Sequence, residues 1–297
     1  MHSDIVIDCQ HLSHSYGKRQ IYNDLSFSVP RGRILGLLGK NGTGKTTIIN
    51  ILSGYLAPSA GRCTIFGTDV RHMPHHMRRQ IGLLIEGHVQ YQFMNIEQIE
   101  HFYAPFFPGQ WRRDAYYELM RKLRVAPRQR ISRMSCGQRS QVALGLILAQ
   151  NPELLVLDDF SLGLDPGYRR LFVDYLREYA RAEQRTVFLT SHIIQDMERL
   201  IDDCIIMDYG RILVQQPVGV LLEQVRQYTC SVPEGYSPTP HQQLYHPTVS
   251  HGRLELTSPI PHQQVAQLLR ADGINPDELQ SHPLNLEDAF IGLTGKY

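Results

Sequence analysis

Apolar segments with few polar positions alternate along the chain with segments of helical spacing. Residues 33–39 (RILGLLG), 153–159 (ELLVLDD) and 186–191 (TVFLTS) each contain such an apolar run. Strands without a polar face are buried on both sides, which is typical of a parallel sheet covered by helices. Residues 45–56 (KTTIINILSGYL) and 168–183 (YRRLFVDYLREYARAE) have the spacing of helices. The pattern predicts an α/β fold with a mainly parallel sheet.

Two stretches interrupt this alternation and divide the chain. From about residue 87 the pattern is aromatic-rich and mostly helical (YQF, HFYAPFF, WRRDAYY), which predicts a helical subdomain inserted at about residues 87–150. After about residue 224 the chain becomes rich in Pro, Ser and Gln, and then shows a strand-like LELTS and a helical PHQQVAQLLRADG. We therefore predict a first domain over residues 1–224 and a small α+β domain over residues 225–297.

The composition is that of an ordinary globular protein. Of the 297 residues, 42% are hydrophobic and 20% are charged, and the net charge is +1, so we expect no nucleic-acid partner. The longest nearly uncharged apolar run covers only residues 142–149, whereas a membrane span needs roughly 18 residues. We expect no signal peptide, and five cysteines without a CxxC pair predict a cytosolic protein. The histidine-rich residues 71–79 predict a solvated basic segment rather than a metal site.

Residues 39–47 (GKNGTGKTT) fit the phosphate-loop pattern G-x-x-x-x-G-K-[ST], between a predicted strand and a predicted helix. The glycines let backbone N–H groups turn toward phosphate oxygens, and the helix adds its positive end. Lys45 can place a charge on the terminal phosphates, and the Thr46 hydroxyl can bind Mg²⁺. The loop predicts a nucleoside triphosphate site. Its predicted contacts are Gly39, Lys40, Asn41, Gly42, Thr43, Gly44, Lys45, Thr46 and Thr47.

Two adjacent carboxylates follow the apolar strand of residues 154–157. Alone, Asp158 and Asp159 would be interpreted as ordinary exposed acids at a strand end. With the phosphate loop upstream, Asp158 is predicted to hold Mg²⁺, through water, beside Thr46.

The chain resembles the ATP-binding subunits of ABC transporters over roughly residues 5 to 222. Further landmarks occur in the family's order and spacing. They are Tyr16 in HSYGK, Ser135, Gly137 and Gln138 in RMSCGQ, Asp165 in SLGLDP, His192 in TSH, and Glu86 where the family has glutamine.

This resemblance implies ATP hydrolysis with Mg²⁺ in a head-to-tail dimer. Each ATP would lie between one phosphate loop and the partner's RMSCGQ segment, with Tyr16 stacked on adenine and Asp165 as a further nucleotide-binding residue. Asp159 occupies the place of the catalytic glutamate, His192 would hold the γ-phosphate and water in line, and Glu86 would approach the metal. The resemblance also implies an antiparallel β subdomain beside the parallel sheet.

The C-terminal segment LNLEDAFIGLTG resembles the ending of exporter-type ATPases of the drug and polysaccharide group. It implies an integral membrane permease of the six-helix type as partner, in a homodimer or a heterodimer. The protein would then be cytoplasmic and peripheral on the inner face of the cell membrane. Asn285, three residues before Asp288, predicts the start of a helix in this segment.

The sequence departs from the family at the reaction centre. Asp159 is one methylene shorter than glutamate, and Phe160 replaces a proline, which we expect to leave the backbone less constrained. Cys136 replaces the first glycine of the signature, and Glu86 brings a charge where an amide is usual. Slow hydrolysis is therefore expected, because general-base catalysis is sensitive to displacements of about 1 Å.

Three functions are compatible with these features. The first is a transporter ATPase that drives a permease, with export as the direction. The second is a slow or non-hydrolysing ATP-dependent switch for a membrane-associated complex, in envelope assembly or motility, which the substitutions at the reaction centre favour. The third is a DNA-repair or translation ABC protein, which a single cassette and balanced charge disfavour.

Overall fold

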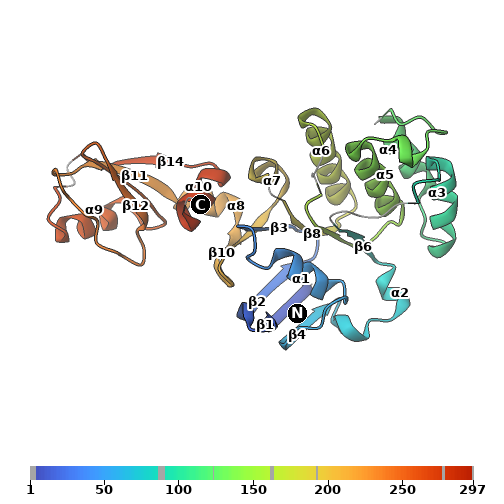
Figure 1. Cartoon of the computed structure of the whole chain (residues 1–297), viewed down its shortest axis with the longest axis horizontal. Helices are drawn as coiled ribbons and strands as arrows, with labels where there is room; N and C mark the ends of the chain where they lie inside the picture. The colour runs from blue at the N-terminus through green and yellow to red at the C-terminus, as the bar shows by residue number, and fades with distance from the viewer. Residues whose placement is uncertain are drawn as a thin grey trace.

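The computed structural model describes residues 5–85, 91–122, 124–160, 164–191, 193–275 and 278–295. These residues form three sheets with helices around them (Figure 1). Among the described residues, no helix combines the length and the apolar character that crossing a bilayer requires.

The central sheet is parallel except at one edge, as the uninterrupted apolar strands predicted. Its strands in spatial order are β10 (Arg211–Pro217), β9 (Asp203–Asp208), β3 (Ile34–Gly39), β8 (Thr186–Thr190), β7 (Leu154–Leu157) and β6 (Ile81–Leu84). All four residues of β7 are buried, and alternate side chains enter different cores. Leu155 and Leu157 belong to the larger core, whereas Leu154 and Val156 belong to the core shared with the N-terminal sheet.

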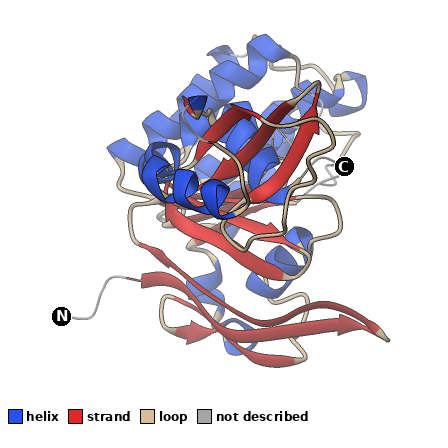
Figure 2. Cartoon of the chain, turned by 90° about the vertical axis from the view of Figure 1, so that its left-hand side faces the viewer, coloured by secondary structure: helices blue, strands red, loops and turns tan. Residues whose placement is uncertain are grey.

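An antiparallel sheet covers one side of the central sheet together with α1 (Lys45–Leu52). In Figure 2 its long strands form a separate layer at the bottom of the view. Its strands in spatial order are β2 (Arg19–Pro30), β1 (Ile5–Tyr16), β4 (Ala60–Ile65) and β5 (Thr68–Asp69). The other side of the central sheet carries α5 (Cys136–Ala149), α6 (Pro166–Ala182), α7 (Ile194–Leu200) and α8 (Val218–Gln224).

The region predicted to be a helical insertion is helical. It contains α3 (Ile96–Tyr103), α4 (Arg113–Lys122) and α5, with short 3₁₀ helices at Ala104–Phe106 and Ile131–Arg133. Just before it, Val70–His72 is a 3₁₀ helix and α2 (His75–Arg78) is a short helix without buried residues. Among the described residues, no group of three or more His, Cys, Asp or Glu side chains is placed to hold a metal ion.

A third sheet begins at Arg226 and is antiparallel throughout. Its strands in spatial order are β12 (Tyr245–Ser250), β13 (Arg253–Ser258), β11 (Arg226–Ser231) and β14 (Gln280–Pro283). One face packs on α9 (His262–Ala271) around a separate small core. The last helix, α10 (Leu286–Thr294), begins where Asn285 predicted, because the Asn285 side chain accepts the Asp288 N–H at 2.8 Å.

Helix α10 connects this third sheet to the rest of the molecule. It contacts β12 and β13 as well as α7 and α8, and it lies between the two lobes of Figure 1. Its apolar side chains belong to the larger core of the central sheet rather than to the small core under α9. They are Leu286, Ala289, Phe290 and Leu293.

Candidate active site

The phosphate loop connects the end of β3 to the start of α1. Gly44 caps the helix in the left-handed region, at φ 99°. A Cβ there would lie 2.6 Å from the Ile21 Cγ2 atom, so only glycine lets β2 approach the loop this closely. The loop and helix therefore have the geometry that presents backbone N–H groups to an anion.

A pocket of about 290 Å³ opens over this loop. It brings together Tyr16, most of the loop and the two carboxylates after β7. Its complete lining is Tyr16, Arg19, Ile21, Asn41, Gly42, Gly44, Lys45, Thr46, Thr47, Asp158, Asp159, Thr190 and Ser191. Tyr16 is 50% exposed, so its ring is accessible at this site. The carboxyl ends of parallel strands lie at one edge of a sheet, which explains the convergence of residues so distant in sequence.

Lys45 is buried in the pocket with its ammonium folded onto its own loop. Its Nζ atom donates hydrogen bonds to the Gly39 carbonyl at 2.6 Å and to the Lys40 carbonyl at 3.0 Å. Burial lowers the pKa of Lys45, and the nearby charges of Asp158 and Asp159 oppose this shift. Because burial removes part of its hydration, the Lys45 ammonium would be stabilised by an anionic ligand.

Thr190, at the end of β8, connects the two carboxylates. Its hydroxyl donates to Asp158 Oδ1 at 2.6 Å and accepts the Asp159 backbone N–H at 3.0 Å. Asp158 Oδ2 is buried and has no hydrogen-bond partner among the described residues. Asp159 itself adopts φ 46°, in the left-handed region, which turns its side chain out of the strand direction.

Phe160 is anchored rather than loose, contrary to the expectation from the missing proline. Its side chain is 2% exposed and its ring stacks on Phe172 of α6, with 5.2 Å between the ring centroids. Burial of this large ring fixes the backbone that follows Asp159.

The RMSCGQ residues lie outside the pocket, at the start of α5. Ser135 and Gln138 form a reciprocal capping box, in which the Ser135 hydroxyl accepts the Gln138 N–H at 3.2 Å. Gly137 lies in the first turn, and Cys136 is exposed. Asp165 caps α6 by accepting the N–H groups of Gly167 and Tyr168. One chain therefore does not bring Ser135, Gly137, Gln138 or Asp165 to its own phosphate loop.

Two loop residues point their side chains elsewhere. The Lys40 ammonium leaves the pocket and donates to the Thr294 carbonyl of α10 at 2.6 Å. The Thr43 hydroxyl is buried and donates to the Lys40 carbonyl at 2.8 Å, which shapes the loop. Glu86 and His192, both expected at the site, lie outside the described residues.

Sequence reasoning did not name Arg19 or Thr190, although both line the pocket. Thr190 is the first residue of the TSH motif that contains His192, and its place in that motif was the available signal. Arg19 follows the HSYGK segment and is the first residue of β2, paired with Tyr16 of β1. Its Nη2 atom would lie 3.4 Å from a Cβ added at Gly42, so the guanidinium is beside the phosphate loop.

Comparison with known proteins gives consistent similarities. A family described as "ABC transporter" matches residues 22–161. The chain is 32% identical to a Nod factor export ATP-binding protein I of Rhizobium johnstonii, over 99% of this chain and 96% of that protein. A solved structure of an ATP-binding subunit of an ABC transporter is 25% identical, with a TM-score of 0.66 over 74% of this chain and 92% of the other.

A bacterial Atm1-family ABC exporter with ATP bound also has this fold, at 23% identity and a TM-score of 0.64. The similarity covers 75% of this chain and 40% of the exporter.

Proposed function

This chain belongs to the ABC transporter family as an ATP-binding subunit and ATPase, and we propose that it hydrolyses MgATP to drive export through a membrane permease. The observation that carries the proposal is the pocket that the buried Lys45 shares with Asp158 and Asp159, whose charges act on its ammonium. A buried cation beside a carboxylate pair is an arrangement suited to phosphoryl transfer with a metal ion.

The residues at the pocket fit Mg²⁺. The buried Asp158 Oδ2 atom lacks a hydrogen-bond partner among the described residues, and the Thr46 hydroxyl lies in the same lining. Hard oxygen donors of this kind suit Mg²⁺, which keeps several waters and needs few protein ligands. We propose that Thr46 and Asp158 hold the ion, with Glu86 as a further candidate. When bound, the ion neutralises charge on the β- and γ-phosphates.

We assign the remaining roles residue by residue. Lys45 and Arg19 place positive charge on the phosphates, while Tyr16 offers its exposed ring to adenine. Asp159 polarises the attacking water, and Thr190 positions it through the Asp159 N–H. His192 is assigned to the alignment of water and γ-phosphate.

The exposed RMSCGQ segment supports a dimer. ABC ATPase subunits dimerise and act with membrane permeases. In this chain Ser135, Gly137 and Gln138 lie at a helix start away from their own phosphate loop. We propose that these three residues complete the nucleotide site of a partner subunit. The N-terminal end of α5, where they lie, is electrostatically favourable for the γ-phosphate bound to that partner.

ATP with Mg²⁺ is therefore expected to shift the isolated chain from monomer to dimer, most clearly in Asp159→Asn, where turnover is blocked. Light scattering coupled to size exclusion would measure the shift. Ser135→Arg places a bulky cation at the proposed interface, and is expected to abolish dimerisation without lowering ATP affinity. A chain that stays monomeric with nucleotide demonstrably bound contradicts this assignment.

An exposed aromatic cluster on the helical region is the proposed docking surface for the permease. Tyr91, Phe93, Phe102 and Phe106 are 38% to 68% exposed, and their rings contact one another in edge-to-face geometry. Clustered exposed aromatic rings mark interaction sites rather than solvent-facing surface. The partner is a polytopic permease, because subunits of this family work on one and because the cluster is apolar rather than charged.

Replacing Phe93 and Phe106 together by serine is expected to reduce co-purification with the permease by about tenfold or more, since buried aromatic anchors dominate interfaces. Pull-down from solubilised membranes, with the permease identified by mass spectrometry, measures this. Tyr209→Ser is the matched control, because Tyr209 is 83% exposed outside the cluster. Unchanged permease recovery with the double variant would remove the cluster from the interface.

We propose export as the direction and a six-helix permease as the partner. The relatives named for Nod factor export match over nearly the full chain, including the C-terminal LNLEDAFIGLTG. We further propose that residues 225–297 act as an appended domain, since their sheet and α9 have a core of their own. Co-expression with the permease recovered by co-purification, followed by transport assays in inverted vesicles, tests the direction.

A slow ATP-dependent switch is the second candidate function. Asp159 in place of glutamate and the exposed Cys136 in the signature favour it. The measured turnover in the presence of the permease separates the two candidates, because a transporter ATPase is stimulated by its partner and a switch is not.

A further inference from the structure

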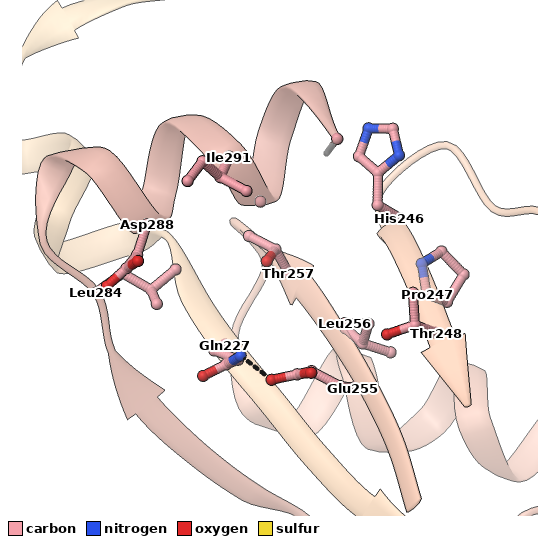
Figure 3. Close-up of a pocket in the computed structure, with 12 residues that line it drawn as sticks. Gln227, His246, Pro247, Thr248, Glu255, Leu256, Thr257, Leu284, Asp288 and Ile291 are labelled. Carbon is pink, nitrogen blue, oxygen red and sulfur yellow. Dashed lines mark hydrogen bonds between the residues drawn. The ribbon is translucent and has the colours of Figure 1, made fainter. Parts of the chain in front are cut away.

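A second pocket lies between the third sheet and α10. Its volume is about 520 Å³, larger than that of the nucleotide pocket. Strands β11, β12 and β13 form its floor, and one side of α10 forms its wall (Figure 3). Gly292 allows this close packing of helix on sheet, because a Cβ there would overlap the Thr257 side chain.

The described lining of the pocket contains two carboxylates, Glu255 and Asp288, and one imidazole, His246, but no lysine or arginine (Figure 3). Glu255 accepts a hydrogen bond from Gln227, and Asp288 faces the same space from α10 (Figure 3). Among the described residues, neither carboxylate forms an ion pair. Leu284 and Ile291 add apolar surface, whereas the Leu256 side chain belongs to the core on the α9 side of the sheet.

Thr257 is a second, independent sign of a ligand. The residue is only 7% exposed and lines the pocket, yet within the described ranges its hydroxyl has no hydrogen-bond partner. The hydroxyl oxygen keeps solvent access at the pocket surface, and a polar group of a bound molecule would replace water as its partner.

We propose that this pocket binds an organic cation, an amine carried on an apolar body. The carboxylates of Glu255 and Asp288 attract the ammonium, the Thr257 hydroxyl accepts one of its hydrogens, and the leucine and isoleucine side chains cover the apolar part. Anionic ligands are disfavoured by the two carboxylates. A bare metal ion is disfavoured because the described residues contain no cluster of three ligating side chains.

Helix α10, the wall of this pocket, contacts α7 at its start and the phosphate loop at its end. At the start of α10, Glu198 of α7 accepts the Leu286 N–H at 2.7 Å, and Gln195 donates to Glu287 at 2.8 Å. At its end, the Thr294 carbonyl accepts the Lys40 ammonium of the phosphate loop. The positive charge of Lys40 is favourable there, because the C-terminal end of α10 carries the negative end of the helix dipole.

From these contacts we infer that amine binding and nucleotide binding are linked through α10. A ligand that favours one position of α10 acts on Lys40 and α7 together, and linkage requires that the effect be reciprocal. The site itself goes beyond the proposed transport function, since amine binding does not depend on which permease is the partner.

Calorimetry on the full chain tests the site with 1-naphthylmethylamine and 1-naphthylmethanol, which share shape but differ in charge. The amine is expected to bind about tenfold more tightly than the alcohol, because hydrogen bonds to charged groups are the stronger ones. Asp288→Asn and Glu255→Gln should each remove most of this preference. Glu234→Gln, an exposed acid outside the pocket, is the charge-matched control and should keep it.

Equal affinity for amine and alcohol overturns the site, as does full amine affinity in both carboxylate variants.

Saturating MgATP is expected to change the amine affinity by about fivefold or more, which is the lower range of allosteric coupling. Lys40→Met and Glu198→Ala, each removing one end of the connection, should abolish that change. ATP binding is measured in the same samples. If ATP binds but the amine affinity does not change, the coupling through α10 is rejected, while the assignment of the ATP site is unaffected.

Discussion

Lys45→Ala is expected to weaken ATP binding by about tenfold to a hundredfold and to abolish measurable turnover. The ammonium is buried and its pKa is lowered by that burial, against the opposing charges of Asp158 and Asp159, and it donates hydrogen bonds to the neutral Gly39 and Lys40 carbonyls. A terminal phosphate would replace these carbonyls with charge-assisted hydrogen bonds, each contributing about 1.5–3 kcal/mol. Titration with a fluorescent ATP analogue, together with phosphate release, measures both effects.

Lys122→Ala is the matched control for Lys45→Ala. Lys122 lies on α4, outside the pocket, and pairs with Glu118 at 3.0 Å on the helix surface, where such pairs contribute little. This variant should bind and hydrolyse ATP as the parent does. Parental affinity and turnover in Lys45→Ala would remove the phosphate-loop assignment altogether.

Asp159→Asn is expected to lower hydrolysis by about a hundredfold to ten-thousandfold while ATP affinity stays within about twofold. The amide cannot accept a proton from the attacking water. The backbone would be retained, because Thr190 holds the residue through its N–H and Phe160 anchors the next position in the core. Single-turnover phosphate release separates this loss from a change in nucleotide binding.

Asp159→Glu is the informative counterpart. If the missing methylene limits the rate, the longer side chain should raise turnover, since misplacement on the scale of 1 Å is costly in catalysis. His192→Ala should lower hydrolysis as well, through loss of the group that aligns water and γ-phosphate. If Asp159→Asn hydrolyses ATP as fast as the parent, Asp159 is not the base, and Glu86 becomes the next carboxylate to replace.

The sequence by itself determined the architecture and the nucleotide site in outline. Strand β7 has four apolar residues in succession because both of its faces are covered, and that composition is visible without coordinates. The phosphate loop is equally local. Its glycines, Lys45 and Thr46 lie within a few residues of one another, and the adjoining strand and helix are set by short-range patterns.

The tertiary structure alone decided which distant groups meet. Thr190 joins Asp158 because β7 and β8 are neighbours in register, and Arg19 reaches the loop because β2 packs across it. The direction of the Lys40 side chain, which runs to Thr294 at the far end of the chain, has no local signature.

The same holds for α10 and the second pocket. A helix could be predicted from Asn285 onward, but its apolar face is equally compatible with the small core under α9 and with the core of the central sheet. Packing of Phe290 and Leu293 into the central core selects the second arrangement, and this leaves a space over Thr257 and Glu255. The spacing of apolar residues along the sequence shows which side of a helix or strand is buried. It does not show which distant element covers that side, because this depends on how the whole chain packs.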